Sequence, residues 1–179
     1  FIMINNQLLN PGQIVIVGGS NNLHKPGGRM VDNIVKGGYA GNIYIVNPKE
    51  EEVQGIRSYH TIRECPAADL AILIIPAKNC VQVIRELAAD KGTRAFIVIS
   101  AGFSEEGEEG ARIEKDMVDV VRQYDACLIG PNCIGLITTR YNGVFTVPVP
   151  RLSEHGCDFV SGSGATAVFI IESALPKGL

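Results

Sequence analysis

The sequence predicts an α/β fold in which helices cover both faces of a doubly wound, parallel β-sheet. Short apolar runs rich in β-branched residues alternate with amphipathic segments along most of the 179 residues, as expected for buried strands and the helices that cover them. Residues typical of turns separate the two kinds of segment. Because parallel strands joined through helices form right-handed units, the alternation indicates a Rossmann-like arrangement.

The stretch after the first apolar run carries the strongest functional signal. Residues 14–17 have the pattern of a buried strand, and residues 18–28 are rich in Gly, Ser, Asn and Pro. After Gly28, apolar residues recur at helical spacing. This plan suits a phosphate-binding loop, because glycine lets the backbone approach a phosphate and the free N–H groups of a helix start attract anions. It also fits a plain strand-to-helix turn with tight geometry.

Further apolar runs predict the rest of the sheet. Strands are expected at residues 42–46, 69–75, 95–99 and 126–129, and helices after Gly28, around 81–91 and around 113–124. Residues 50–52 are expected in a solvated turn, and a short helix is expected near 61–64. Ligands of doubly wound sheets bind at the carboxyl ends of the strands. The candidate site therefore comprises the loops at 18–28, 47–49, 76–79, 100–104 and 130–135.

The alternation of apolar runs and amphipathic segments stops after residue 138. Residues 144–150 are rich in proline and predict a linker or an edge strand. A second strand, glycine turn and helix are then expected over residues 157–174. Because one such unit cannot bury its own faces, we expect a first domain over residues 1–150 and the start of a second, flavodoxin-like α/β domain over residues 151–179.

Composition and charge exclude several classes of protein. With 16 basic and 19 acidic residues, the net charge is −3, which argues against a nucleic-acid-binding protein. No apolar run is long enough to span a bilayer, and the first residues lack the basic segment of a signal peptide. The five cysteines show no C-x-x-C spacing, so we expect reduced thiols, no metal site and a cytoplasmic location.

The second strand end bears on the choice of nucleotide. NAD-binding domains usually carry G-x-G-x-x-G and an acidic residue at this strand end, whereas this chain has Asn47, Pro48 and Lys49. A lysine there favours a phosphorylated ribose, as in coenzyme A or NADP. An exposed turn lysine without a ligand is an equally good interpretation of Lys49.

Five motifs at the predicted strand ends resemble those of one family. They are residues 17–20 (VGGS), 46–49 (VNPK), 75–78 (IPAK), 99–105 (ISAGFSE) and 130–135 (GPNCIG). In this order they resemble the CoA-binding domain of NDP-forming acyl-CoA synthetases, of the ADP-forming acetyl-CoA synthetase type, which are related to the succinyl-CoA synthetase alpha subunit. Residues 159–165 resemble the opening of the family's next domain, with Gly162 where Gln is more usual.

The resemblance implies a reversible ligation in which acyl-CoA, ADP and phosphate exchange with acid, CoA and ATP. In that family a histidine of the second domain carries the phosphoryl group, and an ATP-grasp part binds ATP or ADP with Mg. None of His24, His60 and His155 matches that histidine. We therefore expect this chain to bind CoA or acyl-CoA, to contain no catalytic residue, and to act with the remaining synthetase parts, as a homo-oligomer.

The resemblance also implies the residues that contact CoA. Gly18, Ser20 and Asn22 are expected at its phosphates and Lys49 near its adenosine end, and the residues expected along the rest of the ligand are Pro76, Lys78, Ala101, Gly102, Phe103, Asn132 and Cys133. The last two are expected near the thiol, where acyl transfer occurs. No activating side chain is visible beside Cys133, so a packed thiol is favoured over a nucleophile.

Two alternatives stay open at this point. The chain could be a non-catalytic CoA-binding or regulatory module, for example one fused to an acetyltransferase. It could also be an NAD(P)-binding oxidoreductase or sensor, although the missing glycine pattern and acidic strand end argue against that. The acyl substrate and the choice between ADP and GDP are not readable from the sequence.

Overall fold

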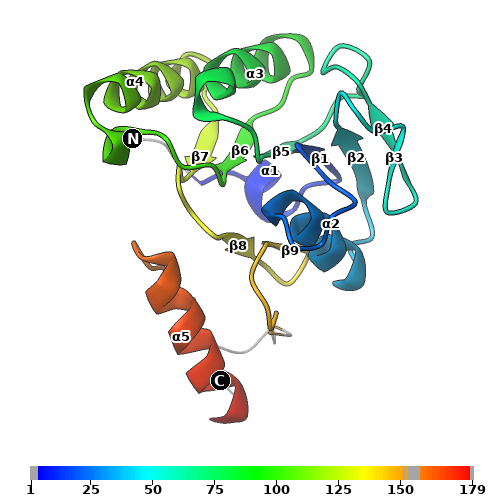
Figure 1. Ribbon diagram of the computed structural model, residues 1–179, viewed down its shortest axis with the longest axis vertical. Helices are drawn as coiled ribbons and strands as arrows, with labels where there is room; N and C mark the ends of the chain where they lie inside the picture. The colour runs from blue at the N-terminus through cyan, green and yellow to red at the C-terminus, as the bar shows by residue number, and fades with distance from the viewer. Residues whose placement is uncertain (1–3, 151, 153–157, 178–179) are drawn as a thin grey trace.

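A seven-stranded sheet forms the centre of the protein (Figure 1), with the order β3-β4-β2-β1-β5-β6-β7. The computed structural model describes residues 4–150, 152 and 158–177. The strands are β1 (Gln13–Val17), β2 (Asn42–Val46), β3 (Glu52–Val53), β4 (Ile56–Tyr59), β5 (Leu70–Leu73), β6 (Ala95–Val98) and β7 (Cys127–Ile129). All neighbours pair in parallel except β3 with β4. The predicted Rossmann-like α/β fold is confirmed.

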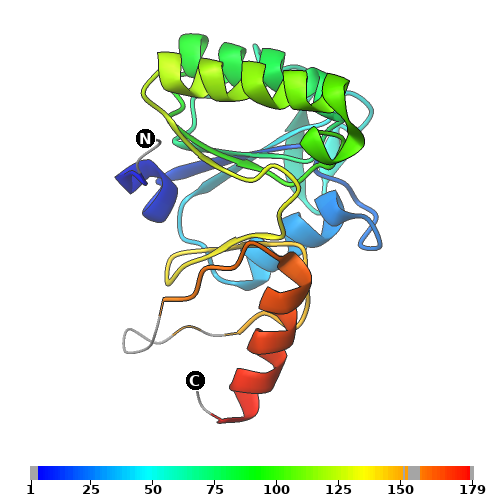
Figure 2. The ribbon, with the colours of Figure 1, turned by 90° about the vertical axis from the view of Figure 1, so that its left-hand side faces the viewer.

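Three helices cover the two faces of the sheet (Figure 2). The helix α2 (Pro26–Lys36) lies on one face, and α3 (Ala77–Asp90) and α4 (Glu108–Gln123) lie on the other. Alternate residues of the strands enter two separate cores, because successive side chains of a strand point to opposite faces. In β1, Ile14 and Ile16 pack with α2, whereas Val15 and Val17 pack with α3 and α4.

Two elements that the sequence analysis did not predict close the α2 side of the sheet. A hairpin of β8 (Gly135–Ile137) and β9 (Asn142–Val144) packs on α2, and the short helix α1 (Asn6–Leu9) lies beside β6. The buried Tyr141 hydroxyl donates a hydrogen bond to the carbonyl of Leu8 at 2.8 Å. The buried Asn33 amide of α2 donates to the carbonyls of Val144 and Thr146 at 2.7 and 3.0 Å.

Of two local predictions between β2 and β5, the solvated turn at 50–52 holds except at Glu52, and the short helix near 61–64 is wrong. The predicted solvated turn contains the start of β3, which pairs with β4 across a turn at Gln54 and Gly55. Residues 61–64 form a turn instead of a short helix. The strand β4 pairs with β2, β3 pairs with β4, and Val53, Ser58 and Ile62 are buried, so tertiary contacts decide the local structure here.

The C-terminal part agrees only partly with the prediction. The helix α5 (Gly164–Ala174) forms as expected and is followed by the 3₁₀ turn η2 (Leu175–Lys177). The predicted strand at 157–160 is absent over residues 158–160, and Cys157 lies outside the described residues. In the described part of the chain no strand lies alongside to pair with it, and Val160 is 93% exposed. Figures 1 and 2 show α5 apart from the sheet.

None of the helices that the structure describes is both long enough and apolar enough to cross a membrane.

Candidate functional site

The carboxyl ends of the parallel strands meet at one edge of the sheet and bring the predicted loops together. Val17, at the end of β1, pairs with Val46 of β2 on one side and with Leu73 of β5 on the other. The chain leaves β1 toward β2 and later returns to the opposite side of β1 as β5. This reversal is the switch point at which doubly wound sheets bind their ligands. The loops that begin at Gly18, Asn47 and Ile74 therefore adjoin one another.

Glycines let the loop after β1 and the start of α2 pack against each other. Gly18 has φ of 93°, and a Cβ atom there would lie 2.3 Å from the carbonyl oxygen of Ile74. A Cβ atom at Gly27 would lie 2.1 Å from the carbonyl oxygen of Gly18, and one at Gly28 would lie 2.1 Å from that of Asn22. Each of these contacts is with backbone, so no side chain can rotate away. The glycine pattern is therefore required by the fold of this loop, whatever it binds.

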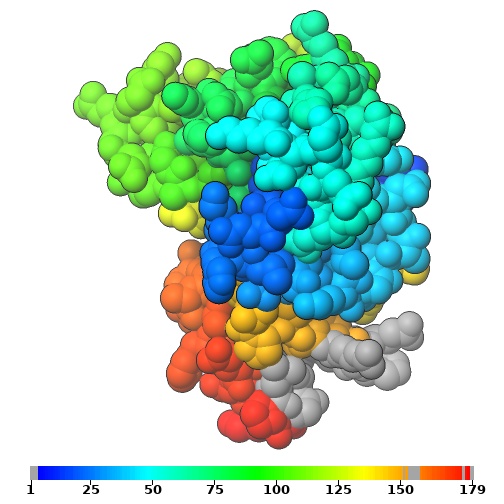
Figure 3. Space-filling view, turned by 45° about the vertical axis from the view of Figure 1, so that its right-hand side comes forward, coloured from blue at the N-terminus to red at the C-terminus, as the bar shows by residue number. Residues whose placement is uncertain are grey.

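Several backbone N–H groups of the same loop remain available to a ligand. The N–H groups of Gly19, Ser20, Asn21 and Leu23 have no acceptor among the described residues. Figure 3 shows the segment around residues 18–28, in blue, at the molecular surface next to the cyan segment around the β3–β4 hairpin. Adjacent free N–H groups in a concave loop form an anion-binding site.

The helix starts at this edge add to the positive potential. Neither α2 nor α3 has a side-chain cap or an acidic residue in its first turn, and their N-cap residues are Lys25 and Pro76. The positive end of each helix dipole therefore remains unneutralised. The first turn of α4 differs, since it carries Glu108 and Glu109. The electrostatics favour an anion beside α2 and α3 over one beside α4.

The side chains of Ser20 and Asn22 partly serve the loop itself. The Ser20 hydroxyl oxygen accepts a hydrogen bond from the N–H of Asn22 at 3.1 Å, and the Asn22 side-chain oxygen accepts one from the N–H of His24 at 2.9 Å. These bonds stabilise turns of the kind that Ser and Asn favour. The Ser20 hydroxyl still has its own proton to donate.

The turn after β2 contains an asparagine whose role the sequence analysis missed. The Asn47 amide donates to the carbonyl of Gly19 at 2.8 Å, and its oxygen accepts from the N–H of Lys49 at 2.9 Å. Asn47 thus joins the turn to the glycine-rich loop. The predicted ligand residue Lys49 is exposed at this turn.

The loops after β5 and β6 form the next part of the edge. Pro76 and Lys78 are exposed at the start of α3. The Ser100 hydroxyl donates to the carbonyl of Ile75 and so joins the two loops. Gly102 has φ of 104°. Its N–H donates to the Glu105 carboxylate at 2.8 Å.

Three predicted residues of the loop after β6 differ in what they can offer to a ligand. Ala101 is exposed and Gly102 is half-buried, so both can lie against a ligand. Phe103 is fully buried, backbone included, in the core with α3 and α4, and it supports the loop from the side of that core. Backbone hydrogen bonds from the loop lower the pKa of the Glu105 carboxyl. Glu105 therefore keeps its negative charge and caps the loop.

The last predicted loop contains Asn132 and Cys133. Asn132 is exposed with φ of 51°, and its N–H donates to the carbonyl of Ser100 at 3.0 Å. The Cys133 thiol donates to the carbonyl of Val98 at 3.4 Å. Burial raises the pKa of this thiol, which makes the nucleophilic thiolate scarce at neutral pH. The structure therefore favours the packed-thiol interpretation of Cys133.

The sequence analysis also missed the contribution of the β3–β4 hairpin to the site. Gln54, at the hairpin turn, contacts the glycine-rich loop through its side-chain amide. The signal that could have found the hairpin is a glycine at the second position of a two-residue connection, between the apolar residues Val53 and Ile56.

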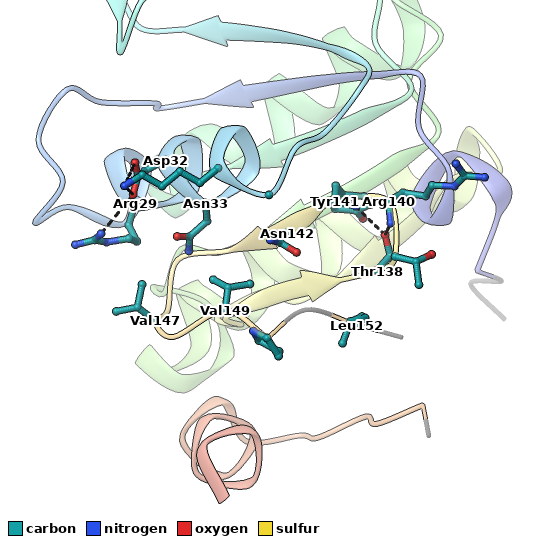
Figure 4. Close-up of a pocket in the computed structure, with 14 residues that line it drawn as sticks. Arg29, Asp32, Asn33, Thr138, Arg140, Tyr141, Asn142, Val147, Val149 and Leu152 are labelled. Atoms are coloured by element: carbon teal, nitrogen blue, oxygen red, sulfur yellow. Dashed lines mark hydrogen bonds and ion pairs between the residues drawn. The ribbon is translucent and has the colours of Figure 1, made fainter. Parts of the chain in front are cut away.

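A groove of about 450 Å³ lies elsewhere, between α2 and the β8–β9 hairpin (Figure 4). Its walls include Asp32 and Asn33 of α2, Tyr141 of the hairpin, and Val147 and Leu152 of the following segment. None of the predicted ligand residues lines it. The chemistry of the strand ends therefore does not involve this groove.

Comparisons with known proteins agree with the motifs. A family model described as CoA binding domain matches residues 12–139. The chain is 36% identical over 171 residues to the alpha subunit of ADP-forming acetate–CoA ligase II of Pyrococcus furiosus, covering 95% of this chain and 37% of that protein. It is 34% identical over 176 residues to ADP-forming acetate–CoA ligase I of Archaeoglobus fulgidus, covering 97% of this chain and 25% of that protein. The chain thus spans well under half the length of these relatives.

Solved structures give the same result. A crystal structure of a protein from Pyrococcus horikoshii OT3 matches with a TM-score of 0.87 and 34% identity, over 97% of this chain and 40% of that one. The dinucleotide forming acetyl-coenzyme A synthetase 1 of Ca. Korarchaeum cryptofilum, in complex with phosphate and ADP, matches with a TM-score of 0.79 and 27% identity, over 95% and 36%. The resemblance inferred from the motifs is confirmed: the chain belongs to the CoA binding domain family.

Proposed function

We propose that this chain is the CoA-binding part of an ADP-forming acyl-CoA synthetase, which interconverts acyl-CoA, ADP and phosphate with acid, CoA and ATP. The observation that carries the proposal is the set of free N–H groups in the loop after β1, beside the uncapped start of α2. A loop of this kind binds the diphosphate of a nucleotide. The names of the relatives, which are acetate–CoA ligases, supply the reaction.

In this proposal the CoA molecule follows the edge of the sheet. Its phosphates bind at Gly18, Ser20 and Asn22, and the phosphate on its ribose binds Lys49. The pantetheine passes along Pro76, Lys78, Ala101 and Gly102, in a loop that the buried Phe103 anchors to the core, toward Asn132 and Cys133. The raised pKa of the Cys133 thiol agrees with a role in shaping the site, so the acyl group is transferred to CoA by groups outside this chain.

The proposal includes the parts that complete the reaction. ATP or ADP and Mg bind to an ATP-grasp part, and the phosphoryl group reaches the CoA site through a second domain. We propose that residues 1–150 are the CoA-binding domain and that residues 151–179 begin this second domain. In this proposal the complete synthetase is a homo-oligomer in the cytoplasm.

Asn47 argues against an NAD-binding site. Its side chain occupies the end of β2, where NAD-binding domains carry an acidic residue that accepts hydrogen bonds from the ribose. Here the Asn47 amide donates to Gly19, and its oxygen accepts from the N–H of Lys49. Both ends of the side chain are therefore engaged within the protein, and the neighbouring charge is the cation of Lys49.

The proposal is tested by titration calorimetry of the 179-residue chain with CoA, dephospho-CoA and NADH, alongside the variant Lys49→Ala. We expect CoA to bind, and Lys49→Ala to weaken CoA by at least about tenfold while leaving dephospho-CoA unchanged, because a charge-assisted hydrogen bond to phosphate is worth about 1.5–3 kcal/mol. Lys115→Ala, which removes another exposed cation, from the middle of α4, is the matched control. Binding of NADH without binding of CoA would overturn the proposal.

A further inference from the structure

The β3–β4 hairpin is attached to the glycine-rich loop by two side-chain amides. From the loop, Asn21 accepts a hydrogen bond from the N–H of Gln54 at 2.8 Å and donates one to the carbonyl of Glu52 at 2.9 Å. From the hairpin, the Gln54 amide nitrogen donates to the carbonyls of Ser20 and Gly28, at 3.0 and 2.8 Å. A primary amide has two N–H groups, so both donors of Gln54 are used.

The two carbonyls that Gln54 joins lie at opposite ends of the loop. Ser20 follows the end of β1 closely, whereas Gly28 belongs to the first turn of α2. One amide group therefore fixes the separation between the beginning of the loop and the helix that follows it. No other residue of the hairpin provides side-chain hydrogen bonds to both places among the described residues.

Gln54 also affects the direction of a free donor. The carbonyl and N–H of a trans peptide point in opposite directions. Because the Ser20 carbonyl points to Gln54, the N–H of Asn21 in the same peptide points away from the hairpin. No group among the described residues accepts a hydrogen bond from this N–H. The bond from Gln54 thus turns a backbone donor toward the side on which a phosphate would bind.

The backbone of Gln54 indicates that its side chain has a role. Its φ is 52°, in the left-handed region, and the next residue, Gly55, has φ of 82°. Such hairpin turns favour Asn or Gly at the first position. A glutamine there is strained, and the two hydrogen bonds of its side chain offset that strain.

We infer that Gln54 is a positioning residue, which holds the loop at 20–28 in the shape that binds the CoA diphosphate. The inference rests on the proposed function and deepens it, because it adds a residue from outside the five motifs to the phosphate site. Gln54 does not contact the ligand in this arrangement, since both of its donors bind loop carbonyls. It acts through the backbone donors of the loop.

The test compares Gln54→Gly with the unaltered chain in three measurements. Glycine removes both side-chain donors but adopts the positive φ without strain. Because the two effects oppose each other, the free energy of unfolding in urea should change little. Calorimetry should show CoA and dephospho-CoA weakened alike, by about tenfold, because binding must then also order the loop. This differs from Lys49→Ala, which should weaken only CoA. Arg57→Ala is the matched control, because Arg57 lies on the same hairpin and stacks on Tyr59 instead of contacting the loop.

Hydrogen exchange of the amides of Asn22, His24 and Lys25, which are hydrogen-bonded within the loop, separates this inference from the proposed function when it is measured without ligand. Gln54→Gly should speed exchange there at least about fivefold, and Arg57→Ala should not. Unchanged exchange would overturn the inference, as would unchanged affinity for CoA in Gln54→Gly. If the unaltered chain binds neither CoA nor dephospho-CoA, the proposed function fails, and the exchange rates alone decide whether Gln54 positions the loop.

Discussion

Replacing Gly28 by alanine tests how tightly α2 must approach the glycine-rich loop. The new Cβ atom would lie 2.1 Å from the carbonyl oxygen of Asn22, 2.6 Å from its carbonyl carbon and 3.1 Å from the nitrogen of Leu23. Because Cβ contacts under 3.0 Å essentially never occur, the loop must retreat by about 1 Å.

Two opposing effects determine how much Gly28→Ala changes the free energy of unfolding. Overpacking of this kind costs about 1–3 kcal/mol, whereas alanine in a helix is favoured over glycine by about 1 kcal/mol. We therefore expect Gly28→Ala to lower the free energy of unfolding by up to about 2 kcal/mol. The displaced loop should also bind CoA at least about tenfold more weakly, because hydrogen bonds to phosphate weaken steeply when donors move or tilt.

Urea denaturation followed by circular dichroism measures the stability, and titration calorimetry measures the affinity. Gly162→Ala is the control, since a Cβ atom there meets open space and the backbone has no positive φ; its stability should stay within about 0.5 kcal/mol of the unaltered chain. If Gly28→Ala is as stable as the unaltered chain and binds CoA equally well, the reasoning about close approach is refuted.

Two further predictions concern stability. Burial raises the pKa of the Cys65 and Cys80 thiols from 9.0 to about 11 and about 12, so above pH 9 the unfolded chain loses these protons first and the native state binds more of them. The free energy of unfolding should then be about 2–3 kcal/mol lower at pH 10 than at pH 8 in urea titrations, and a flat profile would contradict this. Asn33→Ala leaves the carbonyls of Val144 and Thr146 without their donor and should cost about 2–4 kcal/mol by the same method; a loss below about 0.5 kcal/mol would show that water replaces the amide.

The parallel core could be predicted because its signals are local. The residues of β1 and β5 are almost all β-branched or apolar and fully buried, so each strand is a continuous apolar run between turn residues. The helices α3 and α4 each bury one side only, which gives their sequences a helical period. For the same reason the motifs at the strand ends could be placed on the correct loops.

The two hairpins could not be predicted in the same way. The strand β3 is two residues long, and β8 and β9 have three residues each, too short to establish an alternating pattern. Their stability comes from partners that are distant in sequence, such as β2 for β4 and Asn33 for β9. The opposite error occurred at residues 158–160, where an apolar run predicted a strand. A run of this kind forms a strand only if a neighbour satisfies its hydrogen bonds.

The phosphate loop combines both cases, and this explains which of its residues could be found. Gly18, Gly27 and Gly28 could be recognised in the sequence, because glycine is typical of places where another backbone approaches closely. In the structure each of them has such a close backbone contact. Asn21 and Gln54 could not be recognised in this way, since an asparagine in a loop or a glutamine in a turn is common at any protein surface. Their role arises only because the parallel pairing of β2 with β4 brings the hairpin beside the loop. The glycines let the loop form a phosphate site, whereas the separation between the two ends of the loop depends on a contact between segments about thirty residues apart.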